Sequence, residues 1–155
     1  MFHKRKYTPI NPHKYEGNHN NIIMRSSWET RFATWCDRTD NVLKWKSEET
    51  VVPYRSPIDN RIHRYFIDFT ISVKNKEGLV HTYLVEIKPK VQCNPPKFSG
   101  RRTKRYLAES KAYVVNAAKW KAAENYALDR GQKFIILTED ELGLTYKTGL
   151  EKKTK

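Results

Sequence analysis

Polar and apolar residues alternate strictly along residues 65–73. In Tyr65-Phe66-Ile67-Asp68-Phe69-Thr70-Ile71-Ser72-Val73 the odd positions are all apolar or aromatic, and the even positions after Phe66 are polar. This alternation predicts a β-strand with one buried face. Residues 75–78 (Asn-Lys-Glu-Gly) are typical of a turn, and residues 79–88 return as a strand with Tyr83, Val85 and Ile87 at its apolar positions. The pattern therefore predicts an antiparallel hairpin.

Asp68, Glu86 and Lys88 occupy polar positions of the two predicted strands. Because side chains alternate between the faces of a strand, a hairpin that buries its apolar positions gathers these three residues on the other face. A turn centred on Glu77 sets Asp68 opposite Glu86, where Cβ atoms lie about 4.5–5.5 Å apart. Two carboxylates this close repel each other unless one is protonated or a cation neutralises them.

This arrangement suits Mg²⁺, which prefers hard oxygen ligands and is often held by one or two carboxylates and a substrate phosphate. A metal so placed assists phosphate hydrolysis, and Lys88 could orient the attacking water or stabilise the developing charge. Cross-strand ion pairs on a solvated sheet face explain the same three residues, so that alternative stays open.

The rest of the chain predicts helices around a mixed sheet. A helix is expected to begin at Ser26 or Ser27, and its aromatic positions 28, 32 and 35 form one apolar face. Strands are expected at 42–45, 50–54 and 133–137, two helices within 103–130 divided near Asn116, and a capped helix start at 138–141. The expected fold class is α/β, with a mixed sheet flanked by helices.

The domain organisation follows from length and composition. A chain of 155 residues suits one domain. Residues 1–22 are expected to form a basic N-terminal arm that is not packed, residues 23–146 the folded domain, and residues 147–155 a solvated tail. The two cysteines form no zinc motif, and no apolar run suggests a signal or a membrane span, so we expect a soluble protein without a membrane partner.

The charge balance is strongly basic. Thirty Lys and Arg residues against seventeen Asp and Glu give a net charge of +13, which attracts polyanions such as DNA. Seven basic residues and no acidic one lie within residues 88–105. We expect phosphate contacts from Lys90 and from the basic cluster, which consists of Arg101, Arg102, Lys104 and Arg105. A solvated surface of a basic protein is the alternative.

Several ordered segments together resemble a known family. They are residues 25–29 (Arg-Ser-Ser-Trp-Glu), Trp45 with 47–49 and 52–54, residues 64–68 (Arg-Tyr-Phe-Ile-Asp), 85–90 (Val-Glu-Ile-Lys-Pro-Lys), 120–123 and 134–140. The set resembles the head completion nucleases of T-even-type tailed phages, which are related to TnsA-type transposition endonucleases of the PD-(D/E)xK superfamily. The resemblance extends from about residue 6 to residue 142, although Ile67, not proline, precedes Asp68.

The resemblance implies a restriction-endonuclease-like fold and Mg²⁺-dependent cleavage of double-stranded DNA, both endonucleolytic and exonucleolytic, with Mn²⁺ as a substitute. It implies action after DNA packaging, with phage head or neck proteins as partners, in the virion and in the host cytoplasm during assembly. Asp68 and Glu86 would be metal ligands, Lys88 the catalytic lysine, and Glu29 the helix-borne acid that completes the site. Arg25 joins the expected DNA contacts.

Two other functions remain open at this point. One is a non-enzymatic DNA-binding virion protein that uses its charge alone. The other is a TnsA-like or repair-type endonuclease with a defined cleavage site. For Glu29, spacing alone favours a first-turn acid that interacts with the helix dipole.

Overall fold

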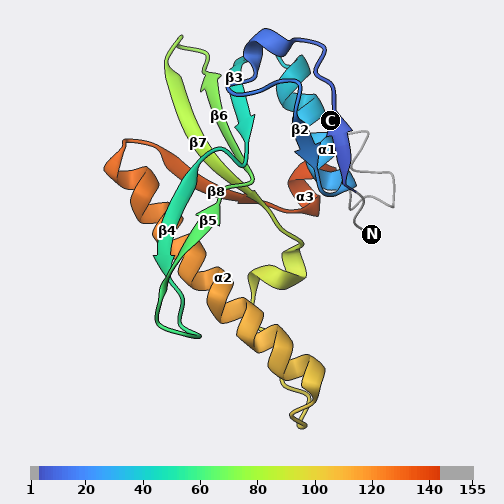
Figure 1. Cartoon of the computed structure of the whole chain (residues 1–155), viewed down its shortest axis with the longest axis vertical. Coiled ribbons are helices and arrows are strands. Elements are labelled where there is room, and N and C mark those ends of the chain that lie inside the picture. The colour runs from blue at the N-terminus through green and yellow to red at the C-terminus, as the bar shows by residue number, and fades with distance from the viewer. Residues whose placement is uncertain (1–3, 144–155) are drawn as a thin grey trace.

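A four-stranded mixed sheet forms the centre of the molecule. The computed structural model describes residues 4–143. The strand order is β3-β6-β7-β8, from β3 (Val42–Ser47), β6 (Phe69–Lys74), β7 (Val80–Ile87) and β8 (Lys133–Leu137). Neighbours are antiparallel except β7 and β8, which are parallel (Figure 1). With its flanking helices, this sheet confirms the predicted α/β class.

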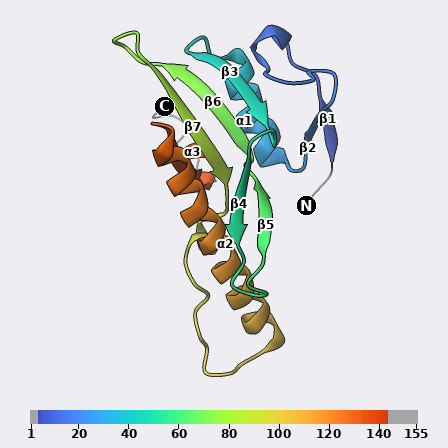
Figure 2. The ribbon, with the colours of Figure 1, turned by 60° about the vertical axis from the view of Figure 1, so that its left-hand side comes forward.

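Helices cover both faces of this sheet. Helix α1 (Ser27–Arg38) and the short α3 (Glu139–Leu142) belong to one hydrophobic cluster, together with the fully buried Trp45 and Phe69. Helix α2 (Lys104–Asp129) packs on the other face through Ala123 and Ala127 (Figure 2). The neighbours Leu84 and Val85 on β7 enter different clusters, because consecutive side chains of a strand point to opposite faces.

A second hairpin extends from the central sheet. Strands β4 (Val51–Arg55) and β5 (Ile62–Phe66) pair with each other and lie alongside α2 (Figures 1 and 2). The sequence predicts one strand over residues 65–73, whereas the structure breaks it at Ile67 and Asp68 into β5 and β6. Alternation does not reveal the break, since Ile67 is fully buried like the apolar residues of a regular strand.

The N-terminal segment differs from the unpacked arm that its composition suggests. Strand β1 (Arg5–Tyr7) pairs with β2 (Ile22–Met24), with the 3₁₀ helix η1 (Pro12–Lys14) between them. The Lys14 ammonium donates to the carbonyl oxygens of Cys36, Asp37 and Thr39 at 2.8, 3.1 and 2.8 Å. One of the basic residues that suggested an arm is therefore buried, and it caps the C-terminal end of α1.

Helix boundaries agree with the sequence in part. Ser26 caps α1 and a Thr138–Glu141 capping box begins α3, as predicted. Residues 104–129 form one helix rather than two, because the alanines that follow Asn116 continue the helix. Trp35, which the sequence places on the apolar face of α1 with residues 28 and 32, is 47% exposed. The second 3₁₀ helix, η2 (Lys90–Cys93), follows β7.

Within residues 4–143, no helix is both long and apolar enough to cross a membrane. The solvated tail expected at 147–155 lies outside the described residues, as do residues 144–146 of the expected domain. The division into arm, domain and tail stays a prediction.

Candidate active site

A β-bulge at Glu48 shapes the centre of the site. Ser47 pairs with Phe69, but Val51 pairs with Phe66, so the register shifts by one residue between β3–β6 and β4–β5. The Glu48 amide donates to the carbonyl oxygens of both Ile67 and Asp68, at 3.1 and 3.2 Å. Glu48 has a φ of 54°, which is rare for a residue with a side chain. Bulges bend a strand and redirect its side chains, and Asp68 lies at this bend.

Strands β6 and β7 pair in the register that the sequence predicts. Their ladder begins with Phe69 opposite Val85, and Asp68 precedes this pair on one chain while Glu86 follows it on the other. The amide of Ile87 donates to Oδ2 of Asp68 at 2.8 Å, which fixes the carboxylate against the end of β7. The structure thus confirms this register.

Glu86 is held on both of its oxygens. The Tyr65 hydroxyl donates to Oε1, and Lys88 Nζ lies 3.4 Å from Oε2. Glu86 is buried and the Lys88 side chain is 20% exposed. The structure therefore brings together Asp68, Glu86 and Lys88, at the point where β7 leaves the central sheet.

Carboxylates dominate the electrostatics of this region. Burial raises the pKa of Asp68 well above its ordinary value, and the negative charges of Glu86, Glu29 and Glu48 raise that pKa further, against the opposing hydrogen bond from Ile87. Burial also raises the pKa of Glu29 and that of Glu48, and Glu86 contributes to both. Like charges held this close favour either protonation or a bound cation.

Glu29 approaches from the N-terminal end of α1. The Ser26 hydroxyl accepts a hydrogen bond from the Glu29 amide at 3.2 Å, and the Glu29 carboxylate accepts one from the Arg25 amide at 3.0 Å. Glu29 thus makes hydrogen bonds at the N-terminal end of its own helix, as its spacing suggests. The negative charge of Glu86 also contributes to the raised pKa of Glu29. Its catalytic role stays a prediction.

The donor set fits a metal in part. Mg²⁺ keeps several waters and needs only one or two protein carboxylates, which Asp68 and Glu86 supply. Among residues 4–143, however, no three His, Cys, Asp or Glu side chains are arranged to hold a metal ion together. Glu29 is therefore not assembled with Asp68 and Glu86 as a third ligand in this arrangement.

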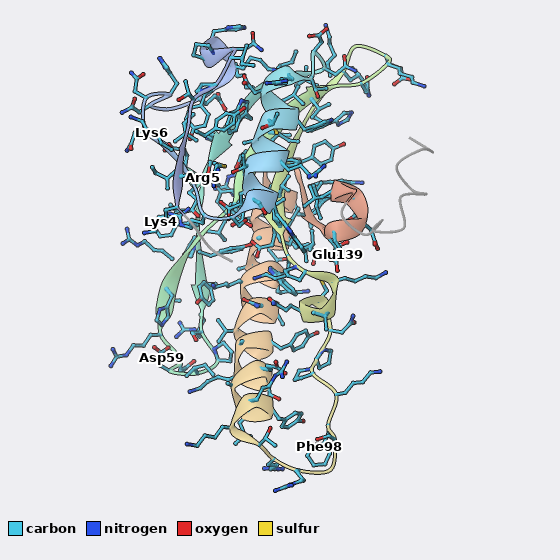
Figure 3. All side chains as sticks on the ribbon, turned by 90° about the vertical axis from the view of Figure 1, so that its right-hand side faces the viewer. Lys4, Arg5, Lys6, Asp59, Phe98 and Glu139 are labelled. Carbon is cyan, nitrogen blue, oxygen red and sulfur yellow. The ribbon has the colours of Figure 1, made fainter. Side chains whose placement is uncertain are left out.

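Half of the predicted DNA contacts already have acidic partners. Arg25 pairs with Glu48, Lys90 Nζ with Asp140 at 3.0 Å, and Arg105 with Glu109 at 3.0 Å. The Lys90 amide also donates to Glu139, which Figure 3 labels on α3. In the part of the chain that the structure describes, the side chains of Arg101, Arg102 and Lys104 make no such pair.

The basic cluster does not adjoin the carboxylates, although it follows Lys88 closely in sequence. It lies at the N-terminal end of α2, which projects away from the sheet (Figures 1 and 2). Lys119 of the same helix lies 5.5 Å from the ring of Tyr65, beside the site. At 1.5 Å per helical residue, Lys104 is about 22 Å from Lys119 along the axis. The cluster is thus two-thirds of a DNA turn of about 34 Å away from the site.

Sequence reasoning missed two residues of the site. The alternation predicts Tyr65 only as an apolar strand position, and nothing in its pattern indicates a bond to Glu86. Glu48 lies in one of the resembling segments, but no pattern marks it as a site residue. Its place between two predicted strands could have suggested a bulge, although glutamate is a weak signal for a left-handed conformation.

The site residues lie within regions that match known proteins. A family model described as the TnsA-like endonuclease N-terminal domain matches residues 39–139, which include Asp68, Glu86 and Lys88 but not Glu29. The chain is 39% identical over 146 residues to the head completion nuclease of Enterobacteria phage T4, covering 92% of this chain and 95% of that protein. No solved structure matches the chain. The chain belongs to the TnsA-like endonuclease family, together with the head completion nuclease of that phage.

Proposed function

We propose that this protein is a divalent-metal-dependent DNA nuclease that acts in phage head completion. One observation carries the proposal: Asp68 accepts a hydrogen bond from the Ile87 amide at the end of β7, next to Glu86, and Lys88 Nζ lies 3.4 Å from Oε2 of Glu86. Membership of an endonuclease family supports hydrolysis of DNA, and the name of the phage T4 relative supports the biological step.

Asp68 and Glu86 are the proposed metal ligands, and Lys88 is the proposed catalytic lysine. When bound, Mg²⁺ or Mn²⁺ would polarise the scissile phosphate and lower the pKa of a water molecule. Ile87 and Tyr65 hold the two carboxylates in place from outside the reacting centre. The Lys88 ammonium can orient the attacking water or stabilise negative charge on the phosphate. Glu29 is proposed to complete the site from α1.

The proposed substrate is double-stranded DNA, cut both internally and from its ends. We propose that the protein acts on packaged DNA beside phage head or neck proteins, in the virion and in the host cytoplasm during assembly. The net charge of +13 favours a DNA substrate, because it raises the encounter rate with a polyanion.

Incubation with plasmid DNA in Mg²⁺, in Mn²⁺ or in EDTA tests this function. Asp68→Asn and Lys88→Met should each reduce cleavage at least a hundredfold, because single transition-state interactions contribute about 10²–10³-fold. Glu77→Gln and Lys76→Met change matched charges in the exposed β6–β7 turn and should cleave normally. Undiminished cleavage by both site variants would eliminate the proposed site.

A non-enzymatic DNA-binding virion protein is the second candidate. The observation that favours it is the lack, among the described residues, of a ready three-ligand metal group. A protein that binds DNA but cuts under none of these metal conditions would establish this candidate. A site-selective endonuclease, suggested by the TnsA-like family model, would instead yield a single cleavage position when the ends are mapped.

A further inference from the structure

The β4–β5 hairpin has one packed face and one exposed face. Val52, Tyr54 and Tyr65 belong to the hydrophobic cluster around α2. The opposite face carries the alternate positions Pro53, Arg55, Ile62, Arg64 and Phe66, all of them exposed. Ile62 is 59% exposed and Phe66 is 41% exposed. Exposed apolar side chains that share one face of a hairpin can mark an interaction site.

The charge of this hairpin is complementary to a polyanion. The hairpin carries three arginines, Arg55, Arg61 and Arg64, and one acidic residue, Asp59. The Asp59 carboxylate is paired with His63 at 2.8 Å. The side chains of Arg61 and Arg64 have no ion pair among the described residues. The Arg64 guanidinium lies 5.4 Å from the centroid of the Phe66 ring. A guanidinium in a cation–π contact of this kind keeps its N–H groups available for phosphate oxygens.

The exposed face is close to the carboxylate site along the chain. Phe66 precedes Asp68 by two residues, about 7 Å of extended chain. Tyr65, the residue between Arg64 and Phe66, bonds Glu86 from the packed face. The exposed face therefore begins two residues before Asp68, close enough along the chain for one DNA strand to contact both.

We propose that the exposed face of the β4–β5 hairpin binds the DNA strand beside the scissile phosphate, with Phe66 stacked on an unpaired base and Arg64 on a backbone phosphate. An aromatic ring can cover the face of a base only where the neighbouring base has been unstacked. The preferred substrate is then DNA with unpaired bases at the cleavage position, as at a frayed end or a junction. This inference rests on the proposed nuclease function.

A pair of labelled duplexes of equal length tests the inference by binding. One is fully paired, and the other has a central unpaired stretch that contains 2-aminopurine, whose fluorescence reports stacking. Without metal, the wild-type protein should bind the unpaired duplex more tightly and change its fluorescence. Phe66→Ala should weaken that binding about tenfold, leave the paired duplex unaffected and abolish the fluorescence change. Phe66→Tyr should keep both the tighter binding to the unpaired duplex and the fluorescence change.

The chain offers a matched control. Phe98 is 56% exposed and lies in the loop on the other side of α2 from the hairpin tip at Asp59 (Figure 3). Phe98→Ala should behave like the wild-type protein. Arg64→Gln should lower the salt dependence of binding to both duplexes by about 0.9 log unit per log salt.

Equal wild-type affinities for the two duplexes would overturn the inference, as would a Phe66→Ala variant that loses affinity for both equally. A change of oligomeric state in Phe66→Ala, with DNA binding intact, would also overturn it and identify the face as a protein interface. These readouts need no cleavage, so they separate this inference from failure of the nuclease proposal, which would appear only as absent cutting in Mg²⁺ or Mn²⁺.

Discussion

The hydroxyl of Tyr65 on β5 donates a hydrogen bond to Oε1 of Glu86 on β7. Burial and the negative charge of Glu86 raise the pKa of Tyr65, so the phenol stays protonated and remains a donor at neutral pH. The contact joins the hairpin to the central sheet across the bend at Asp68. It also leaves Oε2 of Glu86 directed to Lys88.

Tyr65→Phe should change how Glu86 is oriented for metal binding without changing the rate of the chemical step. Groups that orient metal ligands typically contribute about 10–100-fold to metal affinity or activity. We therefore expect a higher Mg²⁺ concentration for half-maximal cleavage, with recovery of rate at saturating Mg²⁺. Titration of cleavage with Mg²⁺ measures this effect.

Tyr54→Phe is the matched control for that experiment. Tyr54 lies in the same cluster, and its hydroxyl makes no hydrogen bond within the described residues. An unchanged Mg²⁺ dependence in Tyr65→Phe, together with reduced thermal stability, would mean that the bond to Glu86 is only structural.

Asp68→Asn should stabilise the metal-free protein near neutral pH. Burial and neighbouring carboxylates raise the pKa of Asp68 in the folded state, so between the unfolded and folded pKa values the folded state binds more protons. The free energy of unfolding therefore falls as pH rises above about 4, the ordinary pKa of an aspartate, and stops falling above the raised pKa. Asp68→Asn does not lose this free energy of unfolding, because asparagine does not ionise.

Thermal melts in EDTA across pH 4–9 measure the difference. Each kcal/mol should change the Tm by about 2–4 °C for a chain of this size. Mg²⁺ should raise the Tm of the wild-type protein but not that of Asp68→Asn. Identical pH profiles for the two proteins would contradict the electrostatic account, and Glu77→Gln serves as the control for removal of an exposed acid.

The sequence predicts the pairing of Asp68 with Glu86 because two local signals agree. Alternation assigns the faces of both strands, and the Asn75–Gly78 turn determines the register. Residue 78 has a φ of 86°, which glycine adopts easily. Where pattern and turn act together, the three-dimensional neighbour of a residue follows from the chain alone.

The bulge, the position of the basic cluster and the packing of the N-terminal segment cannot be predicted from local sequence signals. Glu48 adopts a left-handed conformation because both Ile67 and Asp68 accept its amide, which is a tertiary cause. The basic cluster is close to Lys88 in sequence but about 22 Å from the site along α2, because helix length, not sequence distance, separates them. Sequence alone suggests that Lys14 is solvated, because its partner, the carbonyl oxygen of Cys36 at the end of α1, lies 22 residues away in the chain.

The basic cluster should contribute to affinity rather than to the chemical step. Replacing Arg101, Arg102, Lys104 and Arg105 with glutamine should reduce the slope of log affinity against log salt by about 0.9 for each lost phosphate contact. The cleavage rate at saturating DNA should stay near that of the wild-type protein. Neutralising Lys74 and Lys76, at the β6–β7 turn, is the control, and an unchanged slope in the cluster variant would mean that it does not touch DNA.

Arg25 should become available to bind DNA when the negative charge of its ion-pair partner, Glu48, is removed. Arg25 is bound to Glu48, whose pKa is raised mainly by burial, while the Arg25 charge opposes that shift. Glu48→Gln removes one negative charge near the expected path of the DNA. DNA affinity at low salt should therefore rise a few-fold, whereas Glu49→Gln should leave it unchanged, as measured by fluorescence anisotropy. A lower affinity in Glu48→Gln would contradict a DNA-binding role for a freed Arg25.

Lys14→Met should loosen the N-terminal segment without touching the candidate site. The Lys14 ammonium satisfies three carbonyl oxygens at the end of α1, and the Asp37 carboxylate beside them accepts hydrogen bonds from Tyr7 and from the amides of Ile10 and Asn11. Leaving buried acceptors unsatisfied costs about 1–3 kcal/mol. We expect a lower Tm and faster proteolysis before residue 22, with the Mg²⁺ dependence of cleavage unchanged. Lys6→Met, in the exposed part of β1, should melt like the wild-type protein; equal melting of the two variants would show that the segment is held by apolar packing alone.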